Sequence, residues 1–227
     1  MSSPSVGVLA LQGGVAEHER MLAALGAQAV PVRRPAELDG LDALVIPGGE
    51  SSVLDRLLDV VGLREPLTEA IGGGLPTLGT CAGLVLLARR IDNPAPGQRS
   101  LGILDIAVRR NAFGRQVDSV ETVATWSGAG DGRPGSLRAA AIRAPEVTAW
   151  GEGVKVAATM TVATSDGGRR EAVVGVRQGA VIGISLHSEL TGDPTAHRAL
   201  LAAVTSPPSQ LPGDLHRAGP TGGRPLV

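Results

Sequence analysis

The sequence contains one cysteine, no tyrosine, two tryptophans and one phenylalanine in 227 residues. A single cysteine cannot form a disulfide within the chain, and this fits a reducing compartment. So few aromatic rings make a stacking surface for single-stranded nucleic acid unexpected. Hydrophobic residues make up 43% of the chain and charged residues 19%, so we expect a globular protein with a core of Ala, Val, Leu and Ile.

An excess of charge of one sign is also missing, because the chain has 21 basic and 22 acidic side chains. This balance argues against a nucleic-acid surface driven by net charge, although a local patch stays open. No apolar run reaches the roughly 20 residues that span a bilayer. The initial MSSPSV lacks the basic and apolar regions of a signal peptide. We therefore interpret the chain as cytoplasmic, with no nucleic-acid or membrane partner.

The first half of the sequence alternates between apolar runs and helical patterns. Continuous apolar strands separated by helices predict a largely parallel sheet that is covered on both faces. We expect strands at 6–12, 27–32, 41–47 and 75–79, and helices at 15–26, 51–62, 63–74 and 83–91. Gly26 is the expected C-cap of the first helix, and Ser51 or Ser52 the expected N-cap of the second.

The second half reads as successive strands with short turns. These strands predict antiparallel additions to the same sheet or a small side sheet, and they lie at 103–110, 117–125, 137–144, 154–163, 171–178 and 180–187. A closing helix is expected at 194–204, with Asp193 as N-cap and Pro194 at its first position. We predict one domain over 1–205 and a Pro/Gly-rich, largely disordered tail over 206–227.

The cysteine lies in the sequence Gly79-Thr80-Cys81-Ala82-Gly83, between an apolar strand and an apolar helix. A lone cysteine is most often a small buried hydrophobe. Gly-x-Cys-x-Gly at a strand-to-helix turn is instead the cysteine form of a nucleophile elbow. The N-terminus of the following helix would favour the thiolate, and the Ala82 N–H could stabilise an oxyanion. This context favours a nucleophilic Cys81.

A thiolate nucleophile needs a base and a group that orients the base. His18 and His197 fall on helices, where we expect solvated faces, and His216 lies in the tail. His187 ends a strand, and Glu189 faces the same way because residues two apart on an extended segment do so. Glu189 can then fix the His187 tautomer, which predicts a Cys-His-Glu triad for acyl transfer or hydrolysis. The alternative is a strand-end histidine with a solvent-facing glutamate.

A glycine-rich loop, PGGESS at 47–52, follows a predicted strand and begins a helix. It lacks a lysine and the spacing of a phosphate-binding loop, and Glu50 would repel a phosphate. We interpret the loop as the second side of an oxyanion hole, with the N–H groups of Gly48 and Gly49 facing Cys81. Glu50 could then pair with a substrate ammonium.

The loop, the elbow and the His-x-Glu together resemble class I (triad) glutamine amidotransferase domains, whose fold is flavodoxin-like. Further segments resemble the glutaminase subunit of pyridoxal 5′-phosphate synthase over about residues 6–204. The segments are GVLALQGGVAEH, LVIPGGESS, GTCAGLVLLA, RRNAFGRQVDS, IRAP and SLHSELTGD. The RNAFGRQVDS segment at 110–119 has no part in a general elbow and is specific to this family within the class.

The resemblance implies hydrolysis of L-glutamine to glutamate and ammonia, with no cofactor and no metal. Cys81 would attack the side-chain carboxamide, and His187, oriented by Glu189, would transfer the protons. The implied glutamine contacts are Gly49, Glu50, Ser51, Arg110, Ile142 and Arg143, and the oxyanion groups are Gly48, Gly49 and Ala82. Arginine and glutamate suit the carboxylate and ammonium of an amino acid, although both arginines could instead be surface charges.

The resemblance also implies a partner, a (β/α)₈-barrel synthase subunit that receives the ammonia within a large heteromeric complex. Gln12 would lie at that interface and help set the oxyanion hole; otherwise it is an ordinary strand-end residue. Ser188 stands where the family usually has proline, which frees one backbone φ, and we expect catalysis to survive. Ala112 replaces a common serine.

Two other interpretations stay open. The chain could be a cysteine-elbow hydrolase or an amidotransferase of another pathway, and the RNAFGRQVDS segment argues against this. It could also be a non-catalytic binding or regulatory subunit on the same scaffold. The presence of Cys81, His187 and Glu189 argues against the second interpretation.

Overall fold

A computed structural model describes residues 3–113, 120–127 and 135–205. The helices are α1 (Val15–Ala24), the 3₁₀ helix η1 (Pro35–Leu38), α2 (Ser51–Val60), α3 (Arg64–Gly72), α4 (Ala82–Leu87) and α5 (Thr195–Val204). The first six strands are β1 (Ser5–Leu9), β2 (Gln28–Val32), β3 (Ala43–Ile46), β4 (Thr77–Thr80), β5 (Ala88–Ile91) and β6 (Leu104–Arg109). The others are β7 (Val120–Trp126), β8 (Gly135–Ala141), β9 (Glu146–Trp150), β10 (Lys155–Ala163), β11 (Arg169–Gln178) and β12 (Val181–Ile184).

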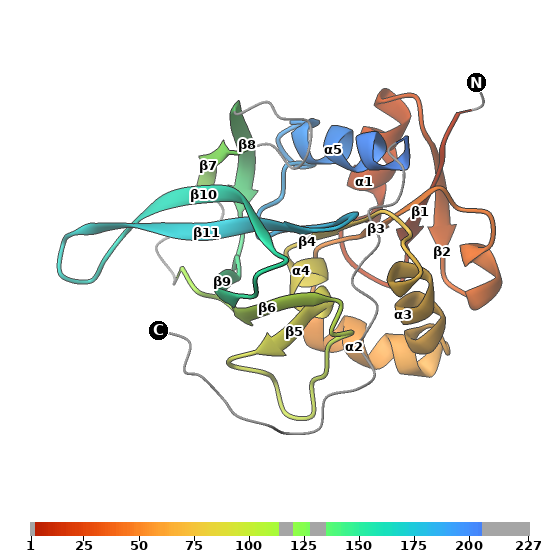
Figure 1. Ribbon diagram of the computed structural model, residues 1–227, viewed down its shortest axis with the longest axis horizontal. Coiled ribbons are helices and arrows are strands. Elements are labelled where there is room, and N and C mark those ends of the chain that lie inside the picture. Colours follow the sequence, from red (N-terminus) through yellow and green to blue (C-terminus); the bar gives the residue numbers. More distant parts are fainter. Residues whose placement is uncertain (1–2, 114–119, 128–134, 206–227) are drawn as a thin grey trace.

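The strands form one mixed sheet, which runs β2-β1-β3-β4-β12-β11-β10-β7-β8 (Figure 1). The first five strands of this order pair in parallel, and the rest add antiparallel strands. β5, β6 and β9 branch from β11. The predicted mixed, largely parallel α/β fold is confirmed. The predicted antiparallel strands of the second half extend the same sheet. β12 is the exception among them on one side, because it pairs in parallel with β4 and antiparallel only with β11.

Alternate residues of the central strands supply two separate cores, because a strand presents successive side chains to opposite faces. Val6 and Val8 of β1 pack in one core with side chains of α1 and α5, whereas Leu44 and Ile46 of β3 pack in the other with side chains of α2, α3 and α4. Helices therefore cover both faces of the parallel region, and its strands read as continuous apolar runs for that reason.

Two elements differ from the sequence-based prediction near the elbow. The predicted helix over 83–91 ends at Leu87, and the chain becomes β5, which pairs in parallel with β6. The exposed Arg89 and Arg90 face away from the core, so an edge strand suits them better than a buried helix. β9 was not predicted, because EVTAW is short and lies between two longer strand patterns.

The predicted helix caps are partly wrong. The N-cap of α2 is Glu50, and neither Ser51 nor Ser52 caps the helix. α5 begins at Thr195 with Pro194 as its N-cap, although Asp193 still accepts a hydrogen bond from the Thr195 N–H at 2.9 Å. The C-cap of α1 is Leu25 rather than the predicted Gly26, which follows it with a positive φ of 79°, as glycine often does just beyond a helix.

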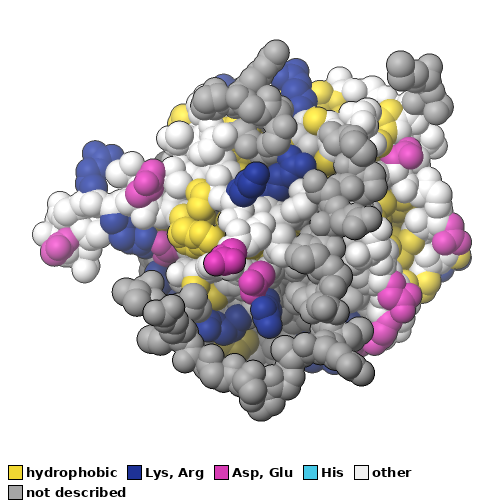
Figure 2. Space-filling view, in the orientation of Figure 1, with side chains coloured by type: hydrophobic (Ala, Val, Ile, Leu, Met, Phe, Trp, Pro, Cys, Tyr) yellow, Lys and Arg dark blue, Asp and Glu magenta, His cyan; other side chains and the backbone are white. Residues whose placement is uncertain are grey.

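The surface fits the balanced charge of the sequence. On the described part of the face in Figure 2, Lys and Arg side chains alternate with Asp and Glu side chains, without one continuous basic area. No helix among residues 3–113, 120–127 and 135–205 is long and apolar enough to cross a membrane. The predicted disorder of 206–227 concerns residues outside the described ranges, as do His216 and residues 114–119 of the RNAFGRQVDS segment.

One glycine sets how closely α4 approaches the sheet. A Cβ on Gly83 would lie 2.1 Å from the carbonyl oxygen of Ile46 in β3. Backbone cannot yield as a flexible side chain can, so the helix after the elbow packs against β3 only with glycine at this position.

Gly83→Ala is therefore expected to reduce the free energy of unfolding by roughly 1–3 kcal/mol or to prevent folding, as over-packing of a core does. Gly72→Ala is the matched control, because Gly72 also lies in a helix and its Cβ would meet nothing within 4 Å. The control should leave stability unchanged or raise it by up to about 1 kcal/mol. Urea unfolding of both variants measures the difference, and equal midpoints would contradict the packing argument.

Candidate functional site

Cys81 occupies the sharp turn between β4 and α4. Its φ of 47° and ψ of −99° place a non-glycine residue in a rarely adopted region, and it is the N-cap residue of α4. The Cys81 N–H donates to the Ile184 carbonyl at 2.8 Å, and its carbonyl accepts from the Val85 N–H at 3.2 Å. Backbone strain of this kind persists only where the surroundings impose it, and it is frequent at functional sites.

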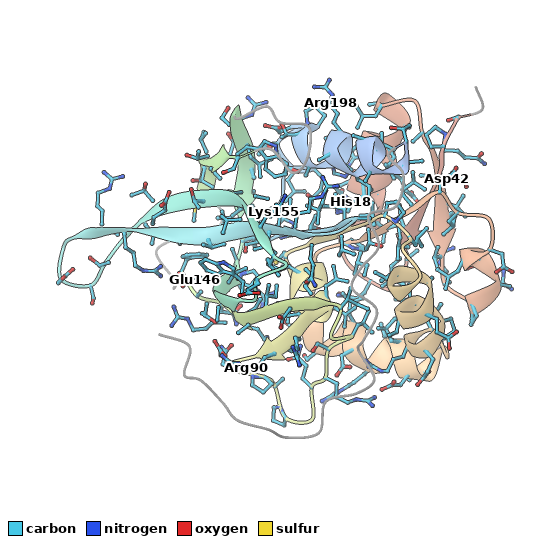
Figure 3. The ribbon with its side chains drawn as sticks, in the orientation of Figure 1. His18, Asp42, Arg90, Glu146, Lys155 and Arg198 are labelled. Atoms are coloured by element: carbon cyan, nitrogen blue, oxygen red, sulfur yellow. The ribbon has the colours of Figure 1, made fainter. Side chains whose placement is uncertain are left out.

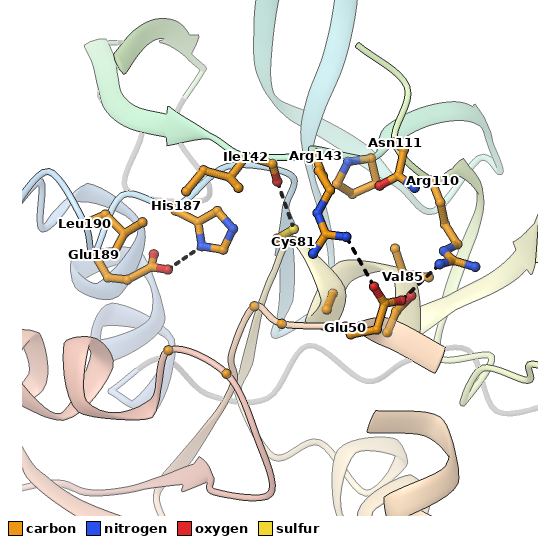
Figure 4. Close-up of a pocket in the computed structure, with 17 residues that line it drawn as sticks. Glu50, Cys81, Val85, Arg110, Asn111, Ile142, Arg143, His187, Glu189 and Leu190 are labelled. Carbon is orange, nitrogen blue, oxygen red and sulfur yellow. Dashed lines mark hydrogen bonds and ion pairs between the residues drawn. The ribbon is translucent and has the colours of Figure 1, made fainter. Parts of the chain in front are cut away.

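The Cys81 sulfur opens into a cavity of about 250 Å³ at the carboxyl end of the parallel strands (Figure 4). Cys81, Asn111 and Arg143 are the non-glycine residues with positive φ in the described ranges, and all three line this cavity. The cavity also brings together every predicted site residue except Gln12: Gly48, Gly49, Glu50, Ser51, Cys81, Ala82, Arg110, Ile142, Arg143, His187 and Glu189.

His187 and Glu189 form a hydrogen-bonded pair beside Cys81. His187 Nδ1 lies 2.7 Å from Glu189 Oε1, and the ring projects towards the Cys81 sulfur (Figure 4). The backbone of His187 exchanges two hydrogen bonds with Ala140, at 2.9 and 3.0 Å, which fixes the start of the turn. The ring lies directly over Gly48, where a Cβ would come within 2.2 Å of His187 Cε1. A glycine is therefore needed at this point of the loop.

Ser188 lies between this histidine and glutamate, in the turn that follows β12. Its carbonyl accepts hydrogen bonds from the N–H groups of Thr191 and Asp193, at 3.2 and 3.1 Å, and from the Thr191 hydroxyl at 3.1 Å. Main-chain hydrogen bonds thus restrain the turn without a proline ring. The Ser188 hydroxyl is buried and has no hydrogen-bond partner within the described residues.

The electrostatics of the pair favour a charged histidine. Burial lowers the pKa of His187, but the Cys81 and Glu189 side chains outweigh burial and raise this pKa to about 10. Burial would raise the pKa of Glu189, but the hydrogen bond from His187 and the charge of that ring hold this pKa below its usual value. Glu189 is therefore a carboxylate and His187 an imidazolium at neutral pH.

The opposite side of the cavity carries an acid and two arginines. Arg110 Nη2 lies 3.0 Å from Glu50 Oε1, and Arg143 Nη1 lies 3.5 Å from Glu50 Oε2 (Figure 4). Arg110 is mostly buried, whereas Arg143 is 60% exposed. The three charges are thus arranged to hold both the carboxylate and the ammonium of an amino acid, once their mutual ion pairs give way.

Two residues that the sequence did not single out hold Arg110 and Ser51 in place. Gln98 accepts from Arg110 Nη1 at 2.8 Å and donates to Ser51 Oγ at 3.0 Å. Asn93 bonds both the N–H and the carbonyl of Arg110, at 2.7 and 3.0 Å. Both lie in the irregular segment between β5 and β6, where no periodicity marked them.

The PGG loop and the start of α4 form the remaining side of the cavity. Ala82 is the first residue of α4, so its N–H has no acceptor within the helix. Gln12 lies outside the cavity and packs over the loop, where its amide donates to the Glu50 carbonyl at 3.3 Å. A Cβ on Gly49 would come within 2.1 Å of the Gln12 amide nitrogen. Gln12 is thus in direct contact with the loop that carries the expected oxyanion N–H groups.

The prediction that His18 and His197 lie on solvated helix faces is wrong. Both are fully buried, and His18 Nδ1 lies 2.9 Å from His197 Nε2 between α1 and α5. His18 Nε2 lies 3.2 Å from Thr80 Oγ1 and 3.6 Å from Glu189 Oε1. Burial lowers the pKa of His18 and lowers that of His197 to about 3, so both rings are neutral at pH 7. Each helix pattern was amphipathic without its histidine, so nothing local showed that the histidine faced inward.

The chain is similar to known proteins over nearly its whole described length. Residues 8–204 match the SNO glutamine amidotransferase family. A protein of Cutibacterium acnes named pyridoxal 5′-phosphate synthase subunit PdxT is 49% identical over 89% of this chain and 98% of that protein. The protein of the same name from Corynebacterium glutamicum is 52% identical over 88% of this chain and 95% of its own length.

Solved structures agree with the fold. A glutamine amidotransferase crystal structure is 42% identical and superimposes with a TM-score of 0.76, covering 88% of this chain and 99% of its own. A glutamine amidotransferase of Thermotoga maritima has a TM-score of 0.56, with 90% of this chain and 97% of its own covered, at 14% identity. The second likeness concerns the fold alone.

The buried histidines are expected to make the fold sensitive to acid. Because their pKa values lie below the 6.5 of a free histidine, the unfolded chain takes up protons that the folded protein does not. Stability should therefore fall as the pH drops below about 6.5, by at most roughly 1.4 kcal/mol per pH unit for each ring. His197→Gln removes one of these rings, so its unfolding free energy should fall less steeply. Urea unfolding between about pH 5 and 6.5 measures both slopes; equal slopes would contradict the assignment.

Proposed function

Because the chain belongs to the SNO glutamine amidotransferase family, we propose that Cys81, His187 and Glu189 are its catalytic triad. The chain is the glutaminase subunit of a pyridoxal 5′-phosphate synthase and provides that enzyme with ammonia. The observation that carries the proposed triad is the 2.7 Å His187–Glu189 hydrogen bond beside a strained Cys81 in one cavity. A nucleophile, a base and an orienting carboxylate in this order are the components of acyl transfer.

In the first half-reaction, the Cys81 thiolate attacks the side-chain carbonyl carbon of L-glutamine. The carbonyl oxygen becomes an oxyanion, which the N–H groups of Gly48, Gly49 and Ala82 would stabilise. The His187 imidazolium, held by Glu189, gives its proton to the departing nitrogen. The C–N bond breaks, ammonia leaves, and a glutamyl thioester remains on Cys81.

In the second half-reaction, His187 is neutral and takes a proton from water. The resulting hydroxide attacks the thioester carbonyl, the C–S bond breaks, and glutamate leaves with Cys81 returned to the thiolate. His187 ends this step protonated, which is the state that its raised pKa favours. Glu189 keeps its charge throughout and stabilises the imidazolium in both half-reactions.

Substrate recognition rests on the opposite side of the cavity. Glu50 would take the α-ammonium of glutamine, and Arg110 and Arg143 would take its α-carboxylate, because these three charges meet on this side of the cavity. Ser51 and Ile142 complete the contacts. Gln98 holds both Ser51 and Arg110, so it would fix this side of the site without touching the reacting bond.

The partner is the synthase subunit that uses the ammonia. We propose that this subunit is a (β/α)₈ barrel, that the two assemble in a large heteromeric complex in the cytoplasm, and that Gln12 lies at the interface. The contact of Gln12 with Gly49 and Glu50 supports this, since docking there would act directly on the oxyanion loop. Catalysis would thereby be coupled to the presence of the subunit that receives the ammonia.

Cys81→Ala should abolish ammonia release from glutamine in the presence of the synthase subunit, because no other residue in the cavity supplies a thiolate. The loss expected for a missing nucleophile is roughly 10⁴-fold or more. Ammonia formation measures activity, and thermal unfolding and co-purification with the synthase serve as controls for fold and docking. A glutamyl adduct on wild-type Cys81, found by mass spectrometry after acid quenching, should be missing from the variant. Undiminished glutaminase activity of Cys81→Ala would refute the proposed mechanism.

Glu189→Gln should move the alkaline limit of kcat/KM to lower pH. The pKa of about 10 at His187 depends on the Glu189 charge, so the neutral amide lowers it and the imidazolium is lost earlier as pH rises. We also expect kcat to fall roughly 10²-fold or more. Glu152→Gln, in an exposed turn outside the cavity, is the matched control and should keep the wild-type profile. An unshifted alkaline limit in Glu189→Gln would argue against the orienting role.

A further inference from the structure

A second pair of histidines lies behind the proposed triad, and the proposed mechanism does not use it. His18 comes from α1 and His197 from α5, and neither ring reaches solvent (Figure 3 labels His18). Their nitrogens are 2.9 Å apart, and the free end of His18 faces Thr80 and Glu189. Thr80 is the residue before Cys81. His18 therefore contacts the side chain of the residue before the proposed nucleophile and lies near the carboxylate of the proposed triad.

Two histidines lie near one oxygen of Glu189. His187 Nδ1 lies 2.7 Å from Oε1, a hydrogen bond, and His18 Nε2 lies 3.6 Å from the same atom. The longer distance is outside hydrogen-bond range, so His18 acts on the carboxylate through its charge distribution. Glu189 Oε2 is buried and has no hydrogen-bond partner in the described part of the chain. Each polar group near this buried carboxylate therefore interacts with it more strongly than it would in water.

The geometry selects one pair of tautomers. If His18 Nε2 carries the proton, an N–H faces Thr80 Oγ1 and Glu189, and His18 Nδ1 accepts from His197 Nε2–H. The reverse arrangement would point a lone pair at a carboxylate and leave the buried His197 Nδ1 as an N–H without an acceptor. His197 Nδ1 has no partner among the described residues, and an unpaired buried acceptor is more common than an unpaired buried N–H.

The His18 ring must also be neutral for the proposed triad to work. A cationic His18 would compete with His187 for the single charge of Glu189. The titratable groups around His18 are Glu189, His187, Glu17 of its own helix and His197 of α5. The carboxylates raise its pKa, but burial dominates and lowers it, with a further contribution from His187. A neutral ring leaves the carboxylate charge to His187.

We propose that His18 is a positioning residue that holds Glu189 in place through a neutral Nε2–H, and that His197 fixes the His18 tautomer from α5. The proposal rests on the proposed function, because it gives Glu189 its place in the triad. It differs from a purely structural role, in which any side chain that filled the space between α1 and α5 would serve. The two roles predict different effects on kcat at equal stability.

Four variants separate these roles when glutamine hydrolysis is assayed with the synthase subunit. His18→Leu fills space without an N–H and should lower kcat roughly 10- to 100-fold, as loss of a supporting partner does, with KM changed less than about twofold. His18→Gln places an amide N–H near the position of Nε2 and should stay within about threefold of wild type. His197→Leu and His197→Gln should show the same contrast in weaker form.

The packing control is Leu22→Ala, which removes buried volume from α1 in the same core. It should lower the melting temperature without the loss of kcat. The proposal is overturned if His18→Leu keeps the wild-type kcat, or if His18→Gln is as impaired as His18→Leu. A wild-type complex without glutaminase activity would instead overturn the proposed function, so the two failures are distinguishable.

Nitrogen-15 NMR of the wild-type chain tests the proposed tautomers and charges directly, even if His18→Leu does not fold. With labelled histidine, His18 and His197 should both be neutral and protonated at Nε2 near neutral pH, and His187 should be charged. The His197→Gln variant assigns the His197 signals. A cationic His18, or one protonated only at Nδ1, would overturn the proposal.

Discussion

The strained conformation of Cys81 is the constraint on which the rest of the site depends. Its positive φ turns the chain from β4 into α4 within one residue and leaves the sulfur at the carboxyl end of the sheet. Regular structure on both sides imposes this turn: β4 pairs with β3 and β12, and Gly83 lets α4 approach Ile46. The strained conformation is therefore maintained by the packing of β3, β4, β12 and α4 around the turn. A strained functional residue persists only where the surrounding structure imposes its conformation in this way.

Much of this could be predicted from sequence, because short-range patterns determine it. Two glycines around a cysteine specify an elbow, and a histidine two residues before a glutamate on an extended segment specifies a pair on one side. The patterns failed where long-range contacts decide. His18 and His197 are far apart in sequence, and only the packing of α1 against α5 turns both rings inward. Gln98 and Asn93 lie in an irregular segment whose path follows from β5, a strand that reads locally as helix.

The burial of the Glu189 carboxylate links the stability of the fold to the protonation of His187. Glu189 lies inside the protein, where an ionised carboxylate is costly unless its neighbours compensate it. His187 compensates it as a cation, and the same contact raises the histidine's pKa, so stabilisation of the acid and activation of the proton donor are one interaction. In the proposed arrangement, the neutral His18 ring behind Glu189 adds an N–H group without adding charge. A second cation there would stabilise Glu189 further and weaken its hold on His187.

The position of β12 explains how members of the proposed triad that are distant in sequence meet. After β5 to β11 have built the branched and antiparallel parts of the sheet, the chain returns to its centre and pairs in parallel with β4, with Ile184 beside Thr80. Parallel pairing brings the carboxyl ends of both strands to the same edge, so the residue after β4 and the turn after β12 face one cavity. An antiparallel β12 would have carried His187 to the opposite edge of the sheet. The parallel return of β12 to β4 is thus the topological condition for placing His187 beside Cys81.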